Sequence, residues 1–160
     1  MAQPAFEATG MIGNLTPEEN KARFRHYYID ELWNAGNLEV IDEILHDDVY
    51  YHQPSFEAET RKADMPAIIE SFHKAFPSGA FTFTIEELVA EDDLVFAFLS
   101  FVGEQKDEFC GVLSSGKTLR FNVLGFYRFA QGKIIECRKH NVGQNVDFVT
   151  AMGIREQLSA

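Results

Sequence analysis

The chain has 160 residues, of which 46% are hydrophobic and 24% charged, and its formal net charge is −11. This length predicts one domain with enough apolar residues to close a core. The acidic balance argues against nucleic acid and anionic membrane surfaces as partners, because both are bound through basic patches. Residues 1–15 lack periodicity and are interpreted as a loose arm, so the predicted single domain covers residues 16–160.

Signals for targeting, disulfides and metal ligation are missing from the sequence. No run approaches the roughly 18 apolar residues of a membrane span, and the N-terminus lacks a secretory pattern, so the cytoplasm is the expected location. Cys110 and Cys137 do not make a disulfide framework. The five histidines show no ligand spacing such as HExxH. No metal and no other cofactor is therefore expected.

Three helices are predicted in the first half of the chain. Thr16-Pro17-Glu18-Glu19 combines a cap, a proline suited to the first helical position and a capping box, so a helix begins there and runs to about Asn34. Asn37 caps a short second helix. Apolar residues recur at helical spacing from Met65 to about Phe76, which predicts a third helix behind Asp64 as its cap.

The second half is almost entirely strand. Predicted strands cover residues 49–52, 81–88, 94–103, 109–113 and the two arms of a hairpin over 117–142, and a short helix follows over 145–152. Helices first and an antiparallel meander afterwards are typical of an α+β fold. We expect a strongly curved antiparallel sheet that wraps the three helices into a cone with an apolar pocket.

The hairpin over residues 117–142 organises the candidate site. A three-residue loop at Ala130-Gln131-Gly132 fits a glycine in the left-handed position. Its predicted pairs are Phe129 with Lys133, Gly125 with Cys137, Val123 with Lys139, and Phe121 with Asn141. Directly opposite residues share a face. One face is then apolar except for Lys139 and Asn141, and the other is mixed and charged, with Ile134 on the mixed side.

Lys139 is the first candidate catalytic residue. A lysine on an apolar face loses solvation, which lowers its pKa and favours the neutral amine. A neutral amine could remove a proton or attack a carbonyl. The alternative is that Lys139 lies near the strand end and extends its amine to water.

His52 and Tyr28 are the other catalytic candidates. His52 could be a general base because the pKa of a free histidine lies near neutrality; the alternative is an exposed turn histidine before Pro54. Tyr27 and Tyr28 are adjacent in the first predicted helix, so only one can face the sheet squarely. Its hydroxyl could stabilise an oxyanion, or its ring could simply pack.

Four polar residues are candidate ligand-binding groups. Asn141 lies beside Lys139 on the apolar face, and Gln105 lies near the end of the strand over 94–103, at the expected pocket rim. His140 faces Asn122 in the predicted register, on the mixed face. That pair would be the site if the faces were reversed; otherwise it lies at a subunit contact or in solvent.

A series of short strings recurs in a characteristic order between residues 16 and 154. They are Glu31-Leu32-Trp33-Asn34-Ala35-Gly36-Asn37, His52-Gln53-Pro54, Phe76-Pro77, Val89-Ala90-Glu91-Asp92-Asp93, Phe109-Cys110-Gly111-Val112, Tyr127-Arg128-Phe129 and Gly132-Lys133-Ile134-Ile135-Glu136. Their order and spacing resemble the SnoaL-like polyketide cyclases, within the ketosteroid-isomerase and nuclear-transport-factor-like superfamily.

The resemblance implies a curved sheet, three helices, a deep apolar pocket for a small apolar molecule, and a homodimer formed through the sheet. It also implies catalysis without a cofactor. Family cyclases carry a pocket carboxylate on the last strand, often with a histidine on the strand before it. Lys139 and Gly125 stand at about these two positions.

Three functional hypotheses follow. The first is a cofactor-independent cyclase, isomerase or lyase that removes a proton next to a carbonyl of a polyketide- or terpenoid-like substrate, with Lys139 or His52 as base and Tyr28 or Asn141 as donor. The second is a non-catalytic ligand-binding or dimerisation domain. The third and weaker one is a hydrolase or hydratase that orients a water between two pocket carboxylates or amides.

Overall fold

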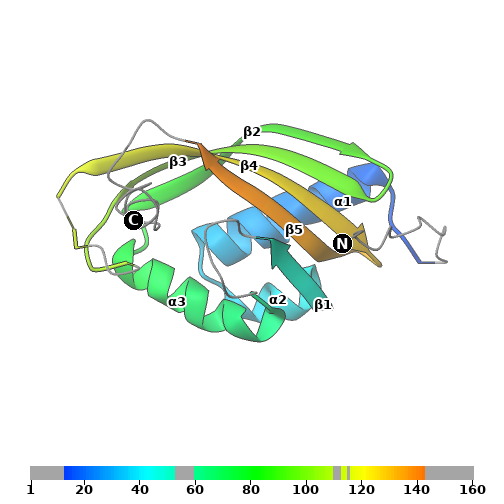
Figure 1. Cartoon of the computed structure of the whole chain (residues 1–160), viewed down its shortest axis with the longest axis horizontal. Helices are drawn as coiled ribbons and strands as arrows, with labels where there is room; N and C mark the ends of the chain where they lie inside the picture. Colours follow the sequence, from blue (N-terminus) through cyan, green and yellow to red (C-terminus); the bar gives the residue numbers. More distant parts are fainter. Residues whose placement is uncertain (1–12, 53–59, 110–112, 115, 143–160) are drawn as a thin grey trace, which may run out of the picture.

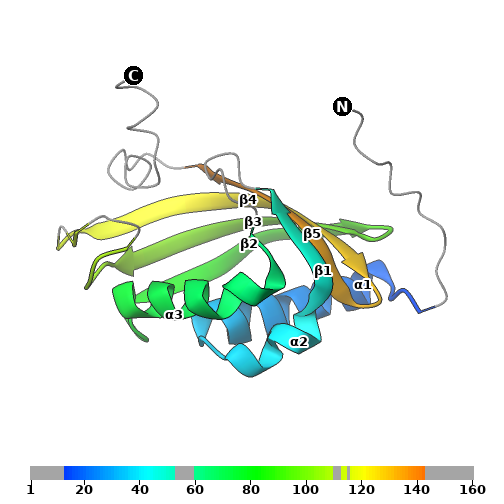
Figure 2. The ribbon, with the colours of Figure 1, turned by 60° about the horizontal axis from the view of Figure 1, so that its bottom comes forward.

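The computed structural model describes residues 13–52, 60–109, 113–114 and 116–142. Within these ranges, three helical regions lie on one side of a five-stranded sheet (Figures 1 and 2). The α+β architecture predicted from the sequence is confirmed. The predictions made for residues 1–12, 110–112 and 145–152 fall outside the described residues. None of the helices in the described ranges is both long and apolar enough to cross a bilayer.

The first helix begins at the predicted capping box and consists of α1 (Pro17–Arg23) and the π-helical segment η1 (Phe24–Asn34). The Thr16 hydroxyl accepts from the backbone N–H of Glu19, and the Glu19 carboxylate accepts from the N–H of Thr16. These two bonds satisfy backbone donors that a helix start leaves open. The segment η1 turns its buried side chains toward the sheet: Phe24, Tyr28, Ile29 and Leu32.

The other helical regions cover the same side of the sheet (Figure 2). They are η2 (Leu38–Val40), α2 (Ile41–Ile44), η3 (Lys62–Asp64) and α3 (Met65–Ala75). Asn37 caps η2 as predicted, accepting from the N–H of Glu39. Asp64 does not cap α3: its carboxylate accepts from the N–H of Arg61 instead, because the short turn η3 precedes the helix.

The sheet has the strand order β1-β5-β4-β3-β2. Its strands are β1 (Leu45–His52), β2 (Phe81–Glu91), β3 (Leu94–Glu104), β4 (Thr118–Ala130) and β5 (Lys133–Val142). The meander from β2 to β5 is antiparallel, as predicted, but β1 runs parallel to β5. The expectation of an all-antiparallel sheet was therefore wrong. No hairpin joins β1 to β5, so no tight turn imposes an antiparallel direction on them.

The register of the last hairpin differs from the predicted one. The loop has two residues, Gln131 and Gly132, with φ of 53° and 76°, the backbone signature of a type I′ turn. A bulge in β5 then adds Ile135 opposite the Arg128–Phe129 step. The two differences together shift the pairing by two residues. An even shift leaves faces unchanged, although the bulge moves Ile134 to the buried face.

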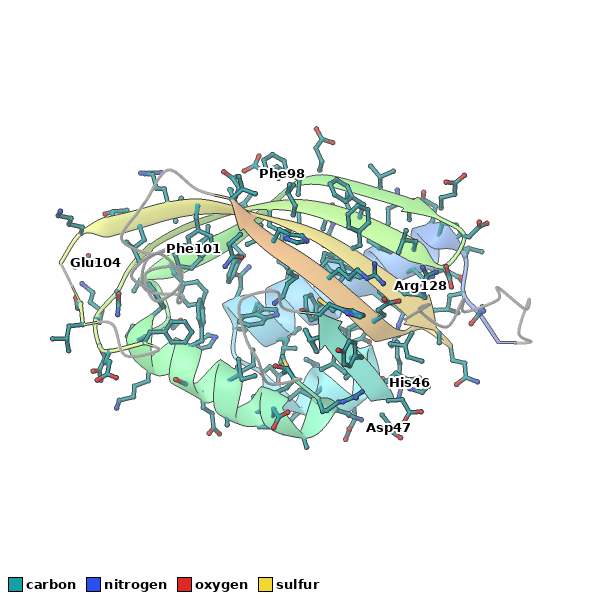
Figure 3. All side chains as sticks on the ribbon, viewed as in Figure 1. His46, Asp47, Phe98, Phe101, Glu104 and Arg128 are labelled. Carbon is teal, nitrogen blue, oxygen red and sulfur yellow. The ribbon has the colours of Figure 1, made fainter. Side chains whose placement is uncertain are left out.

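The corrected pairs are Gly125 with Lys139, Tyr127 with Cys137, Val123 with Asn141, Leu124 with His140, and Asn122 with Val142. Side chains on the inner face of the sheet, toward the helices, are buried at nearly every second position of β3 and β4. Phe101, for example, packs against Phe76 at the end of α3 with ring centroids 5.2 Å apart. Figure 3 shows the side chains on both faces of the sheet. The outer face carries no helix of the described ranges (Figure 2).

Candidate functional site

Lys139 lies on the inner face of the sheet. Its Nζ is 5.0 Å from the ring centroid of Trp33 in η1 and 5.5 Å from that of Tyr51 in β1. The residue is half-buried. Its amine lies over two aromatic rings and does not extend along the sheet into water. Tyr51 comes from β1, which pairs with β5, and Trp33 comes from the helical segment η1.

The electrostatic environment of Lys139 is unusual for a lysine. No carboxylate of the described ranges forms an ion pair with its amine, and loss of solvation lowers its pKa. A charged Cys137 would oppose this shift, but burial raises the pKa of that thiol to about 12 and keeps it neutral. The two rings attract an ammonium by about 0.5–2 kcal/mol, which opposes the desolvation. The neutral amine is thus more accessible here than at an ordinary surface lysine.

Three buried tyrosines form a cluster with one another, and one of them, Tyr51, lies under this amine. The hydroxyls of Tyr28 and Tyr51 are 3.5 Å apart, and the rings of Tyr28 and Tyr127 have centroids 5.3 Å apart. Burial raises the pKa of all three phenols well above the usual value. Each hydroxyl therefore stays protonated at neutral pH and can donate a hydrogen bond.

The Tyr127 hydroxyl has no hydrogen-bond partner among the described residues, although it is fully buried. Its ring folds back over Gly125: a Cβ on that glycine would lie 2.6 Å from the Tyr127 hydroxyl oxygen. Since Gly125 pairs directly with Lys139, the hydroxyl lies over the backbone opposite the lysine. A buried polar group without a partner is costly, so the described residues leave the hydrogen-bonding capacity of this hydroxyl unused.

Sequence reasoning did not name Tyr127 as a site residue. A signal was present: Gly125 interrupts a predicted strand, and a tyrosine follows two residues later on the same face. A glycine within a strand often marks a place where another group approaches the backbone closely. Here the approaching group is the Tyr127 ring.

The structure places His52 away from Lys139. Tyr51 pairs with Cys137 and points inward, so the next residue, His52, pairs with Arg138 and points to the outer face. There the Nε2 of His52 lies 3.0 Å from the Glu136 carboxylate. Two of the three predicted catalytic residues, Lys139 and Tyr28, thus belong to one cluster, and the third does not join it.

Glu136 is the centre of a charged network on the outer face. It pairs with Arg128 at 3.2 Å and Arg138 at 2.9 Å, and Arg128 also contacts Asp93 at 2.8 Å. Partial burial acts to raise the pKa of Glu136, but hydrogen bonds from the two arginines outweigh it and lower the pKa. The carboxylate is committed to these cations and lies on the face opposite Lys139.

The four predicted ligand-binding residues do not gather around Lys139. Asn122 donates its amide to the carbonyl of Leu99 and does not face His140, which is exposed; the expected pair was wrong because the register shifts by two residues. Asn141 follows Lys139 on the inner face but is exposed at the strand end. Gln105 is buried and donates to the carbonyl of Asp107, beyond β3.

Within the described ranges, no group of three or more His, Cys, Asp or Glu side chains has an arrangement that could hold a metal ion. The chemistry that the inner cluster can perform is that of an amine and phenols. An amine can accept a proton or attack a carbonyl carbon, and a phenol can donate to a developing oxyanion.

Comparison with known families identifies the chain. The family model described as SnoaL-like polyketide cyclase matches residues 22–144, which is more than half of the sequence. The chain belongs to the SnoaL-like polyketide cyclase family. The resemblance inferred from the short strings is thereby confirmed. Comparison with curated proteins gives no significant match.

Solved structures with the same fold cover nearly the whole domain. AclR from Streptomyces galilaeus, provisionally named a hydroxylase, has 23% identity and a TM-score of 0.68 over 86% of this chain and 98% of its own. A provisionally named SnoaL-like polyketide cyclase from Jannaschia sp. has 21% identity and a TM-score of 0.70 over 88% of this chain and 97% of its own. IdmH from Streptomyces antibioticus, provisionally named a polyketide cyclase, has 24% identity and a TM-score of 0.65 over 88% of this chain and 100% of its own. At these identities the likeness shows the fold.

Proposed function

We propose that this SnoaL-like protein is a small-molecule enzyme that removes a proton next to a carbonyl group of an apolar substrate, leading to cyclisation, isomerisation or elimination. The observation that carries the proposal is the desolvated amine of Lys139 on the same face of the sheet as the unpartnered hydroxyl of Tyr127, which lies over Gly125, the residue paired with Lys139. A base and a hydrogen-bond donor on one face are what enolate chemistry requires. The family to which the chain belongs supports a cyclase-type reaction.

In the proposed step, the neutral amine of Lys139 accepts the proton from the carbon next to the carbonyl. The electron pair of the broken C–H bond moves into the carbonyl, whose oxygen gains negative charge. The hydroxyl of Tyr127 donates a hydrogen bond to that oxygen. The Trp33 and Tyr51 rings then face the ammonium that the reaction creates, so the charge develops where cation–π attraction favours it.

This assignment replaces the family's usual base. The resemblance implied a carboxylate at about the position of Lys139, and a carboxylate there would act as an anion that becomes neutral on accepting a proton. An amine is neutral before the step and cationic after it. The aromatic neighbours of Lys139 suit a developing cation, which is the reason that we assign the base to Lys139 and not to His52.

The other two hypotheses receive less support. A hydratase would need two carboxylates or amides around one water, whereas the amine of Lys139 faces the rings of Trp33 and Tyr51 and forms no ion pair with a carboxylate of the described ranges. A non-catalytic binding domain explains an apolar site but gives no reason for an unpaired amine within it. A binding domain would keep ligand affinity after Lys139→Met, whereas the proposed enzyme loses turnover.

We also propose that two copies of the chain associate through the outer face of the sheet. Val89 in β2, Phe96 in β3 and Phe126 in β4 are cross-strand neighbours that form a continuous apolar row. Val89 is 58% exposed and Phe126 45% exposed. Exposed apolar rows of this kind mark interaction surfaces, and the family resemblance implies a homodimer through this face.

The test of the enzyme proposal is hydrogen–deuterium exchange at the carbon next to the carbonyl. A panel of apolar aryl ketones and β-keto esters is incubated with the protein in D₂O and followed by proton NMR. We expect exchange with the natural chain, a loss of at least about tenfold in Lys139→Met, and a loss of about tenfold to a hundredfold in Tyr127→Phe.

Lys74→Met is the matched control, because the Lys74 side chain is 74% exposed and lies at 3.5 Å from Asp107. It removes an amine without touching the cluster, so its exchange rate remains that of the natural chain. Exchange that persists unchanged in Lys139→Met contradicts the assigned base, and a complete lack of exchange across the panel favours the binding-domain hypothesis.

A further inference from the structure

The amine of Lys139 differs from the other lysine amines of the described ranges in what surrounds it. Four of the others form ion pairs with carboxylates. These four are Lys21 with Glu18, Lys62 with Asp42 and Asp47, Lys74 with Asp107, and Lys106 with Glu104. Lys139 instead faces only the rings of Trp33 and Tyr51 as cation partners. It is the amine best placed to act as a nucleophile.

We propose that Lys139 forms a covalent imine with an aldehyde or reactive ketone group of the ligand that binds between Trp33 and β5. The inference shares the site of the proposed function and goes beyond it, because the bond to the ligand is covalent. It also names the substrate class: an apolar molecule with an unhindered carbonyl, most favourably a conjugated aldehyde. An imine would acidify the neighbouring C–H bond, but Lys139 is then bonded to the ligand and no longer serves as the base, so the covalent step and the proton removal are separate uses of the same amine.

The atoms of this step balance without an oxidant or reductant. The nitrogen of Lys139 attacks the carbonyl carbon and forms a C–N bond, while the carbonyl electron pair moves to oxygen. The nitrogen releases a proton and the oxygen gains one, which gives a carbinolamine. The C–O bond then breaks, water leaves with a second proton, and the nitrogen lone pair closes the C=N bond. Aldehyde plus amine thus give imine plus one water.

Two features of the cluster assist this sequence. The carbinolamine oxygen gains negative charge as it forms, and the Tyr127 hydroxyl, a buried hydrogen-bond donor without a described partner above the strand position opposite Lys139, would donate a hydrogen bond to it without giving up its proton. The protonated imine is a delocalised, weakly hydrated cation. Trp33 and Tyr51 stabilise such a cation through their ring faces without requiring water or a counter-charge.

Cys137 does not compete as the nucleophile in this cluster. Its side chain is buried and its pKa is raised to about 12, so the reactive thiolate is scarce at neutral pH. A carbonyl ligand that reaches the cluster therefore meets one reactive group, the amine of Lys139. Adduct formation should accordingly be confined to nitrogen.

The experiment is reductive trapping with cinnamaldehyde, an apolar conjugated aldehyde, in the presence of sodium cyanoborohydride. Intact-mass analysis counts the adducts, and peptide mapping locates them. We expect one dominant adduct on Lys139, formed faster than on any other lysine, because a lowered pKa raises the neutral fraction of the amine. The rate should rise with pH and level off at a lower pH than for the other lysines.

Two variants make the result decisive. Lys139→Met removes the amine, and Lys139→Arg keeps a cation over the two rings but cannot form an imine, so both lose the dominant adduct while Lys74→Met keeps it. Adducts spread evenly over the exposed lysines, or an unchanged adduct in Lys139→Arg, would overturn the inference. Deuterium exchange without any trapped adduct would overturn the covalent imine and leave the proposed function intact. Trapping on Lys139 without deuterium exchange would support the imine and contradict the proposed function.

Discussion

The buried hydroxyl of Tyr127 gives a prediction in which stability and activity move in opposite directions. Tyr127 is fully buried, its hydroxyl has no partner among the described residues, and its ring packs 4.5 Å from that of Phe24. Tyr127→Phe keeps the ring and removes only the oxygen. Burying an unpaired hydroxyl costs about 1–3 kcal/mol, and the small space left by the oxygen returns part of that cost.

We therefore expect Tyr127→Phe to raise the free energy of unfolding by about 1 kcal/mol. For a domain of this size that corresponds to an increase in Tm of about 2–4 °C. The same variant should lose deuterium exchange, because the donor to the enolate oxygen is gone. Urea titrations followed by fluorescence of Trp33, the sole tryptophan of the chain, measure the stability directly.

Tyr28→Phe is the matched control. Tyr28 is equally buried, but its hydroxyl lies 3.5 Å from that of Tyr51. Removing it leaves the Tyr51 hydroxyl without this partner, so the control should lose about 0.5–1.5 kcal/mol where Tyr127→Phe gains stability. A loss of 1 kcal/mol or more in Tyr127→Phe would refute the reasoning, because it would mean that the hydroxyl already bonds within the protein and is not free for a ligand.

Three further predictions follow from the same structure. Lys139→Met should raise the free energy of unfolding at neutral pH and flatten its dependence on pH. The pKa of Lys139 is lower in the native chain than in the unfolded chain, so between these two pKa values the unfolded chain binds more protons and the stability of the natural chain rises with pH. Urea titrations from pH 6 to 10 that give parallel curves for both chains contradict this. Gly125→Ala places a Cβ 2.5–2.7 Å from the Tyr127 ring and should cost about 1–3 kcal/mol; an unchanged thermal midpoint would show that the ring moves freely. Phe126→Lys should convert a dimer to a monomer in light scattering, with little loss of monomer stability because Phe126 is 45% exposed, and a natural chain that is already monomeric would refute the proposed interface.

The sequence predicted the inner face of the hairpin correctly despite a wrong register. The predicted three-residue loop and the missed bulge at Ile135 shift the pairing by two residues, and an even shift preserves which side chains share a face. Lys139 and Tyr127 were thus placed on one face by alternation alone. Ile134, next to the loop, was the exception, because the bulge lies between it and the rest of the strand.

The direction of β1 and the side of His52 could not be read from local pattern. The partner of β1 is β5, at the other end of the described chain, and nothing in the residues around His52 encodes that long-range pairing. The strand predicted over residues 49–52 begins earlier, at Leu45, so that the polar run His46-Asp47-Asp48 is part of β1, where the register shifts between Leu45 and Tyr50. Only the pairing of Tyr51 with Cys137 decides that Tyr51 faces the helices and His52 faces away.

The most direct test of the account is the titration of Lys139 itself. Carbon-13 labelling of the lysine side chains, with Lys139→Arg to assign the resonance, allows each amine to be followed by NMR from pH 6 to 12. The account predicts that Lys139 titrates at a lower pH than the other lysines, because it is desolvated and has no described carboxylate partner. A Lys139 that titrates together with Lys74 or above it would contradict the claim that this amine is poised as base and nucleophile.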